Sequence, residues 1–307
     1  MSYYTQRHGM RKSVSRTYTI TPPMYELLFK CCEKYYNNIA WKFPSQCQDG
    51  HGCCGLEVDD FCTMLKFEIP NLYCDDYGKP AIPKIHHSYL RSEEHWDEYD
   101  QFALLDYIEF FAQNCRDVDV GRLHDYFGHH HLTCKQTALV FKAFKAEIND
   151  LFEKTGLLYQ LTDAKIIERI VENSVLTPDI EKQIEQVKEV GTQQLLEEAI
   201  VLHKQPYPPS ARDAVEKIWD AFERLKTYYT DMDKKGSASK IVGDVAGGNK
   251  PLSVLLESEF KSLTEIGNNY RIRHHETNKI DIDDLRHYDY FFNRCLALIA
   301  LAIQYLQ

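Results

Sequence analysis

The 307-residue sequence predicts a mainly α-helical protein built from three consecutive parts. Over most of the chain, apolar residues recur at spacings of three and four, which is the pattern of amphipathic helices. Alternation with β-branched residues, which is typical of strands, is confined to one short segment. We therefore expect an N-terminal helical domain over 1–156, a small β-hairpin as a connection over 157–175, and a C-terminal helical bundle over 176–307.

The N-terminal domain is expected to contain four main helices. The segment from Pro22 to Trp41 repeats its apolar residues every three or four positions, and "EVDDFCTMLKFEI" and "EYDQFALLDYIEFFAQNC" follow as two further helices. The fourth helix, "CKQTALVFKAFKAEINDLFEKTG", is predicted to have Thr133 as its N-cap and Gly156 as its C-terminal stop. Between the helices, "PSQCQDGHGCCG" and residues 70–95 are expected to be irregular because they are rich in turn-forming and polar residues.

The pattern changes after Gly156. "LLYQLTDAKIIERIV" predicts a two-stranded hairpin around a Thr-Asp turn. The bundle that follows is predicted to begin with Thr177 as a cap and Pro178 at the first helical position. Its other helices are "TQQLLEEAIVLHKQ", "SARDAVEKIWDAFERLKTYYT", "PLSVLLESEFKSLTEIGNNY" and "DDLRHYDYFFNRCLALIALAIQYLQ". The last of these is apolar almost all round, which indicates a central helix. "KKGSASKIVGDVAGGNK" is interpreted as a flexible Gly/Ser/Lys loop.

Charge and composition argue against several classes of protein. The formal net charge is −10, from 36 Lys and Arg against 46 Asp and Glu, which argues against a broad surface for duplex nucleic acid but allows one small basic site. The chain has no run of 18 apolar residues, so no membrane span is expected. The first 20 residues lack the apolar centre of a signal peptide, and the ten cysteines are scattered. We therefore expect a cytoplasmic protein with free thiols.

Two groups contain residue types that bind metals. The first group comprises Cys47, His51, Cys53 and Cys54. Adjacent cysteines cannot easily both turn to one ion, and no CxxC pair is present, so ordinary thiols are favoured over a structural zinc site. In "GHHHLTC", the three consecutive histidines His129 to His131 are not expected to share a face, and we interpret them as a polar loop or helix lead-in. The sequence therefore predicts no metal and no cofactor.

The segment "NNYRIRHHETNK", residues 268–279, lies between the last two predicted helices and contains two arginines and two histidines that could take part in catalysis. Arg271 or Arg273 could hold a phosphate through a bidentate contact. A neighbouring histidine could take a proton from a ribose 2′-hydroxyl, because the histidine pKa lies near 7. These groups suffice for metal-free RNA cleavage. The alternative is a solvated turn whose charges pair with the nearby acids Glu276, Asp281, Asp283 and Asp284.

Several stretches resemble known proteins. "AVEKIWDAFERLKTYYTD", "LLESEFKSLTEIGNNYRIRHHE" and "HYDYFFNRCLALIALAIQYL" resemble the C-terminal region of bacterial abortive-infection proteins of the AbiJ type, which is similar to HEPN (higher eukaryotes and prokaryotes nucleotide-binding) domains. "YYTQRHG", "ALLDYIEFFAQNC" and "EINDLFEKTGLLYQLTD" are similar to the N-terminal domain that accompanies this region. The resemblance covers most of the chain and implies a helical bundle that acts in anti-phage defence.

The HEPN resemblance also implies a site. Many HEPN domains are metal-independent ribonucleases that dimerise and carry an R-x(4–6)-H motif, in which a polar residue usually follows the arginine. Arg273 matches that arginine and His274 the polar residue, but no histidine stands five to seven places further on. His275 then takes the place of the motif histidine, four positions after Arg271.

The expected site follows from this assignment. Its catalytic residues are Arg273, His274 and His275, and its substrate-binding residues are Arg271, Asn269 and Glu276. The expected partners are RNA and a second copy of the chain, bound through the C-terminal bundle. In the alternative, the chain is a non-catalytic sensor or assembly module that binds a phage protein, a nucleotide or a partner toxin.

Overall fold

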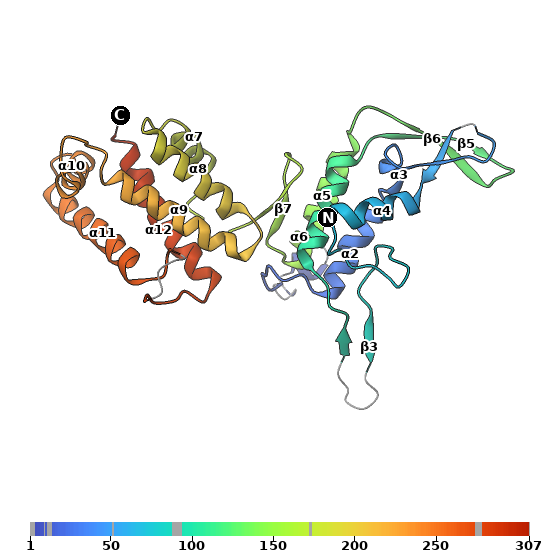
Figure 1. Ribbon diagram of the computed structural model, residues 1–307, viewed down its shortest axis with the longest axis horizontal. Helices are drawn as coiled ribbons and strands as arrows, with labels where there is room; N and C mark the ends of the chain where they lie inside the picture. Colours follow the sequence, from blue (N-terminus) through green and yellow to red (C-terminus); the bar gives the residue numbers. More distant parts are fainter. Residues whose placement is uncertain are drawn as a thin grey trace. The chain divides into compact units, whose positions relative to one another are not determined.

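The computed structural model describes residues 4–8, 10, 14–50, 52–87, 94–171, 174–273 and 278–306. The chain divides into two compact units, Met1–Arg169 and Ile170–Gln307, both visible in Figure 1. Helices dominate both units, so the prediction of a mainly α-helical protein is confirmed. The first unit contains more strands than the two of the single predicted hairpin.

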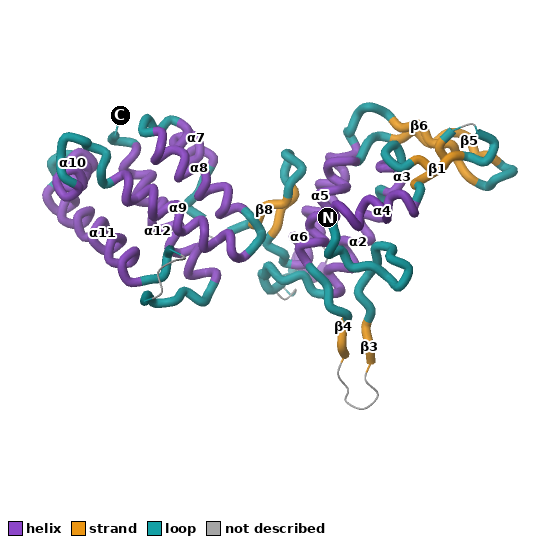
Figure 2. Tube along the Cα trace, viewed as in Figure 1, coloured by secondary structure: helices purple, strands orange, loops and turns teal. Residues whose placement is uncertain are grey.

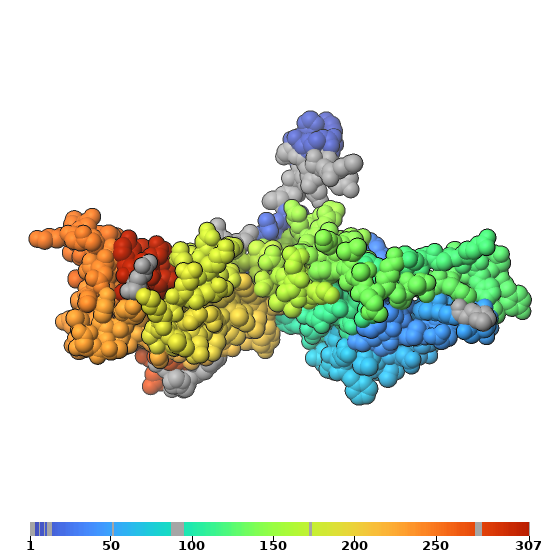
Figure 3. Space-filling model, turned by 90° about the horizontal axis from the view of Figure 1, so that it is seen from above, coloured from blue at the N-terminus to red at the C-terminus, as the bar shows by residue number. Residues whose placement is uncertain are grey.

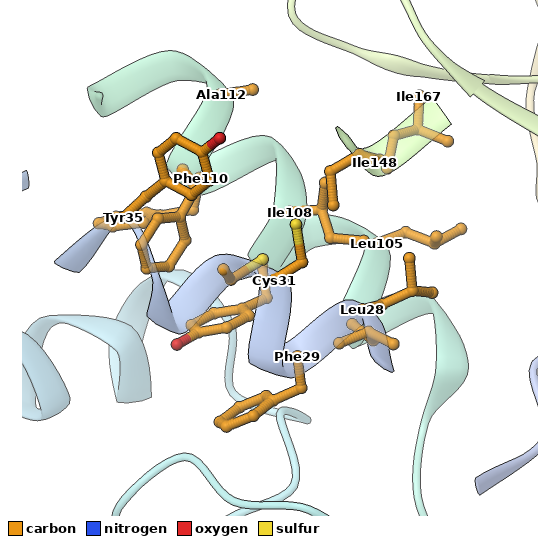
Figure 4. Packing of buried hydrophobic residues seen from close by; sticks show 14 of the residues in the cluster. Leu28, Phe29, Cys31, Tyr35, Leu105, Ile108, Phe110, Ala112, Ile148 and Ile167 are labelled. Carbon is orange, nitrogen blue, oxygen red and sulfur yellow. The ribbon is translucent and has the colours of Figure 1, made fainter. Parts of the chain in front are cut away.

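Three helices form the core of the first unit: α2 (Pro22–Glu33), α5 (Gln101–Asn114) and α6 (Val140–Thr155). They are joined by the shorter helices α1 (Tyr4–Arg7), α3 (Tyr36–Ile39) and α4 (Val58–Glu68). Figure 4 shows buried side chains of α2, α5 and α6 packed together, with Phe29 and Ile108 among them. Phe29 stacks on Tyr107 of α5 with ring centroids 5.3 Å apart. Burial of this apolar and aromatic surface is the main stabilising contribution to the unit.

The prediction that Thr133 caps the fourth helix is wrong. Helix α6 begins at Val140, and the carboxylate of Asp117 accepts hydrogen bonds from the backbone N–H groups of Leu139 (2.8 Å) and Val140 (2.7 Å). A carboxylate from a distant part of the chain thus satisfies the free N–H groups of the first turn. The predicted end is confirmed: Gly156 is the C-cap with a φ of 77°, a conformation that favours glycine.

Four strands form an antiparallel sheet that was not predicted, and its first two strands lie at the segment "PSQCQDGHGCCG", which was expected to be irregular. The four strands are β1 (Pro44–Gln46), β2 (Cys53–Leu56), β5 (Val118–His124) and β6 (His129–Cys134), in the order β1-β2-β6-β5. The sheet consists of two hairpins joined between β2 and β6, where Cys53 pairs with Leu132. In Figure 2 the sheet lies at an edge of the first unit, beyond α3 and α4. Thr133, expected at a helix start, lies in β6 and pairs with Asp119.

Two further hairpins belong to the first unit. Strands β3 (Ile85–His87) and β4 (Glu94–Trp96) pair within the segment that was expected to be irregular. Strands β7 (Tyr159–Leu161) and β8 (Ile167–Arg169) form the hairpin predicted after Gly156. Tyr159 and Ile167 are buried in the core of this unit.

The second unit is a bundle of six described helices. They are α7 (Pro178–Glu185), α8 (Val190–Lys204), α9 (Pro208–Leu225), α10 (Lys234–Ala246), α11 (Lys250–Asn269) and α12 (Leu285–Ile303). Thr177 caps α7 as predicted, because its side chain accepts a hydrogen bond from the N–H of Ile180. The predicted flexible loop is wrong, since residues 234–246 form α10 and bury Ile241 and Val242. Glycine and serine content concealed this apolar face, and Gly247 ends the helix with a φ of 55°.

The centre of the bundle is formed by α9 and α12, which pack on each other. Eight residues of α12 are buried, among them Phe292 and Cys295, which agrees with its apolar pattern. Trp219 of α9 is 1 % exposed, and its indole N–H donates to the carbonyl of Leu263 in α11. Within the described part of the chain, no helix combines the length and the apolar character needed to cross a bilayer.

One charged contact ties α8 to α9. The Glu189 carboxylate caps α8 by accepting hydrogen bonds from the N–H groups of Gly191 and Thr192, and it pairs with Arg224 through two contacts of 2.7 Å. Arg224, with further hydrogen bonds from Thr192, holds the pKa of Glu189 well below its usual range. A carboxyl with a lowered pKa stabilises the fold above its unfolded pKa, and this stabilisation disappears as the pH falls towards the folded pKa.

We therefore expect the variant Glu189→Gln to lose about 1 kcal/mol of unfolding free energy at neutral pH, as for the loss of a helix cap. The difference from the wild-type protein should shrink when the pH is lowered below about 4, where the unfolded carboxyl is protonated. Urea denaturation of both proteins at neutral pH and below about pH 4 measures this difference in unfolding free energy. Glu265→Gln, at an exposed carboxylate 3.8 Å from Lys261, is the control and should change little. An equal loss in both variants would contradict the capping role.

Candidate functional site

The segment between α11 and α12 is fixed to the bundle at both ends. The N–H of Arg271 donates to the carbonyl of Ile280 at 2.8 Å, and the N–H of Ile280 donates to the carbonyl of Asn269 at 2.9 Å. The side chains of Ile272 and Ile282 are buried in the core of the second unit. The described residues of the predicted site therefore lie where the segment between α11 and α12 is hydrogen-bonded and packed against the bundle.

Both arginines of the predicted site are paired with carboxylates. A terminal nitrogen of Arg271 lies 2.7 Å from Asp281, at the end of the same loop. A terminal nitrogen of Arg273 lies 3.0 Å from Asp220 on α9. All four side chains are about one-third to one-half exposed. Such exposed ion pairs contribute at most about 1 kcal/mol, so a ligand phosphate can compete with the carboxylates.

Of the other four residues of the predicted site, the structure describes only Asn269. His274, His275 and Glu276 lie outside the described residues. Asn269 is the last residue of α11, and its backbone carbonyl accepts the hydrogen bond from Ile280. The structure thus places Asn269 and the two arginines at the base of the loop.

Two residues near this base were not singled out from the sequence: Arg212 of α9 and Tyr288 of α12. Burial raises the pKa of the Tyr288 hydroxyl, and the positive charges of Arg212 and Arg271 oppose that rise. Each arginine therefore lies within electrostatic reach of the Tyr288 hydroxyl, as do the carboxylates of Asp281 and Asp283, which raise its pKa further. Nε of Arg212 is buried, and no described residue accepts a hydrogen bond from it. Arg212 and Tyr288 lie on helices far apart in the sequence, so only the packing of α9 and α12 could reveal them.

A pocket of about 840 Å³ lies beside the loop. Its lining includes Tyr270, Phe291 and three acidic residues, Asp281, Asp283 and Asp284. Arg294 also lines it, but its guanidinium is bound to Glu259 at 2.8 Å and to Ser262 at 2.9 Å. The pocket shares Asp281 with the ion pair of Arg271. The pocket wall next to the arginines therefore carries three carboxylates, of which Asp281 is paired with Arg271 and Asp284 with Arg286.

The comparisons with known proteins identify the class. The chain belongs to the family defined by AbiJ N-terminal domain 4, whose model matches residues 2–186. Membership in this family associates the chain with abortive-infection defence. The matched region includes the whole described first unit and ends just after α7, so it does not include the arginine loop. No curated protein and no solved structure matches the chain.

Proposed function

We propose that this protein is an abortive-infection effector whose C-terminal bundle is a metal-independent endoribonuclease of the HEPN type. The observation that carries the proposal is the group of arginines at the base of the loop. Arg271 and Arg212 lie within electrostatic reach of Tyr288, as do Asp281 and Asp283, and the Nε of Arg212 is buried without an acceptor among the described residues. A buried guanidinium nitrogen normally donates a hydrogen bond, and an anion such as a phosphate is a suitable acceptor.

The proposed reaction is transesterification within RNA. Arg271 and Arg273 bind the scissile phosphate and stabilise the charge that develops on its oxygens. His275 removes the proton from the 2′-hydroxyl, whose oxygen then attacks phosphorus in line with the departing 5′-oxygen. His274 supplies a proton to that 5′-oxygen. The P–O5′ bond breaks, and the products carry a 2′,3′-cyclic phosphate and a 5′-hydroxyl.

The ion pairs define the resting state of the proposed site. In that state Asp281 and Asp220 neutralise Arg271 and Arg273, and a bound phosphodiester takes over their contacts. Asn269 and Glu276, at the base and in the loop, orient the substrate in this proposal. The resemblance to HEPN domains also implies a homodimer through the C-terminal bundle, which sedimentation of the purified full-length chain measures.

Incubation of the full-length chain with end-labelled single-stranded RNA in excess EDTA tests the proposal. We expect endonucleolytic products in EDTA at the same rate as with Mg²⁺, because the nucleophile belongs to the substrate. RNA in which the ribose 2′-hydroxyls are methylated should remain intact under the same conditions. Intact unmodified RNA, or cleavage that EDTA abolishes, would contradict the proposed mechanism.

A second function is favoured by a different observation. Both arginines described in the loop are already neutralised by carboxylates, and two further acidic residues, Asp283 and Asp284, line the neighbouring pocket. A non-catalytic module that binds a phage protein or a partner toxin fits such a surface. Affinity purification from infected cells distinguishes the two functions: a stoichiometric protein partner, together with absence of RNA cleavage, selects the module.

A further inference from the structure

A cluster of metal-binding side chains lies at the edge of the first unit, where the two hairpins of the four-stranded sheet meet. The cluster comprises Cys47, His124, His129 and His131, and one ligand atom from each lies within 4.8 Å of all the others. Cys47 directly follows β1, His124 ends β5, and the other two histidines belong to β6. Residues 118–134, green in Figure 3, form the end of the first unit that carries the histidines.

The interpretation of the three consecutive histidines as a polar loop or helix lead-in is wrong, because they lie in strand β6. Successive side chains of a strand point to opposite faces, so His129 and His131 point to the same side. Their ring centroids are 5.5 Å apart. His130 points the other way, and its Nδ1 lies 2.8 Å from the carbonyl oxygen of Gly121. The sequence motif thus supplies two ligands and one outward-facing histidine.

Two of the separations between the ligand atoms match the edges of a tetrahedron around one ion. With Zn–N bonds of about 2.05 Å and a Zn–S bond of about 2.3 Å, the tetrahedral edges are about 3.4 Å for N···N and about 3.6 Å for S···N. Nδ1 of His124 lies 3.4 Å from Nε2 of His131 and 3.6 Å from Sγ of Cys47. A hydrogen bond between two ring nitrogens would be about 3.0 Å long. These two separations are therefore close to those expected between ligands of one tetrahedral ion.

The fourth ligand has no other partner among the described residues. Nε2 of His129 is buried, and no described atom forms a hydrogen bond with it. Its ring is held in place by Phe127, which stacks on it at 5.8 Å with an interplanar angle of 11°. The carboxylate of Asp49 lies 3.4 Å from Nδ1 of His124 and adds negative charge beside the cluster. Both features favour a bound cation.

Two turns bring the ligands together. Gly50 donates its N–H to the carbonyl of Cys47, and Cys47 donates its own N–H to the carbonyl of Gly52, which turns the chain after β1. Gly128, with a φ of 67°, donates to the carbonyl of His124 and closes the turn between β5 and β6. Backbone turns of this kind fix the positions of the ligands before an ion binds.

The sheet itself has little apolar core. In β1, β2, β5 and β6, the only buried described side chain is Leu132. Val120 and Leu123 of β5 are 63 % and 50 % exposed. Small structures that cannot bury sufficient apolar surface are commonly stabilised by a structural metal. The single residue pair between β2 and β6 adds few hydrogen bonds between the hairpins.

We propose that Cys47, His124, His129 and His131 bind one structural zinc ion that joins the two hairpins of this sheet. One thiolate and three imidazoles in a tetrahedron suit Zn²⁺ better than Mg²⁺ or Ca²⁺, which prefer oxygen ligands. Four protein ligands close the coordination shell, so the ion serves the fold rather than catalysis. The site lies in the unit matched by the AbiJ family model and is independent of the proposed ribonuclease site in the second unit.

Elemental analysis of the untagged full-length protein tests the proposal. We expect one zinc per chain in the wild-type protein and a decrease of about tenfold or more in Cys47→Ser and in His131→Ala. Matched controls are Cys54→Ser, whose thiol lies 3.4 Å from the carbonyl of Ser45, and His130→Ala on the outer face. Both controls should keep their zinc. Equal zinc contents in the ligand variants and the controls would overturn the assignment.

A second measurement does not depend on the folding of any variant. After zinc is removed from the wild-type protein with a chelator, stoichiometric Co²⁺ should restore the visible absorption bands of tetrahedral cobalt, with a charge-transfer band from one thiolate. Zinc should then displace the cobalt and bleach these bands. Wild-type protein that contains no zinc and gives no cobalt bands would overturn the proposal.

Discussion

Replacement of either loop arginine by alanine, Arg271→Ala or Arg273→Ala, is expected to reduce RNA cleavage by about 100-fold or more. A donor that contacts the scissile phosphate stabilises charge that develops in the transition state, and removal of one such donor typically costs two to three orders of magnitude in rate. Lysine at either position should restore only part of the activity, because it cannot reproduce bidentate binding. The measurement is the single-turnover rate in EDTA at a fixed salt concentration.

The matched control is Arg286→Ala. Arg286 lies near the same loop and also pairs with a carboxylate, Asp284, but its side chain is 87 % exposed. We expect its cleavage rate to stay within about twofold of wild type, since it does not belong to the arginine group near Tyr288. The unfolding free energies of all three variants should change by less than about 1 kcal/mol, because the ion pair that each variant removes is partly or largely exposed. Equal losses of activity in Arg286→Ala and Arg273→Ala would indicate general loss of RNA affinity instead of a catalytic contact.

Removal of zinc is expected to open the four-stranded sheet while the helical core of the first unit stays folded. Metal coordination contributes directly to the folding free energy of the structure that holds the ligands. We expect hydrogen-exchange protection in β5 and β6 to fall by about 100-fold, or ~3 kcal/mol of local stability. Protection in α5, where Tyr107 and Phe111 are fully buried, should be unchanged.

His130→Ala provides the control for this experiment, because it lies in the same strand but on the opposite face. It should keep its zinc-dependent protection, whereas His131→Ala should lack protection in β5 and β6 even when zinc is added. Identical exchange in the presence and absence of the chelator would contradict a structural role for the metal.

The helices could be predicted from the sequence because their signals are local. Spacing of apolar residues and end residues such as Gly156 and Thr177 depend only on neighbours along the chain. The four-stranded sheet could not be predicted, since its strands are short, exposed and separated by more than 60 residues between β2 and β5. Helix α10 was missed because its glycines obscured a buried face that includes Ile241.

The same limit applied to the two sites: residues close together in the chain could be recognised from the sequence, and residues brought together by the fold could not. Arg271 and Arg273 stood out because they are close to two histidines in the chain, but Asp220, which pairs with Arg273, comes from α9, and Tyr288, within electrostatic reach of Arg271, comes from α12. The ligand cluster was missed because Cys47 lies far along the chain from the histidines. Once β6 is recognised as a strand, the spacing of His129 and His131 becomes a signal.

Identification of the RNA ends made by the full-length chain in EDTA tests the central claim most directly. Mass spectrometry of a defined oligonucleotide should show fragments that end in a 2′,3′-cyclic phosphate and begin with a 5′-hydroxyl, and Arg273→Ala should make at most about one-hundredth of them. Fragments with 5′-phosphates, or an intact oligonucleotide at stoichiometric protein, would contradict the proposed attack by the ribose 2′-oxygen.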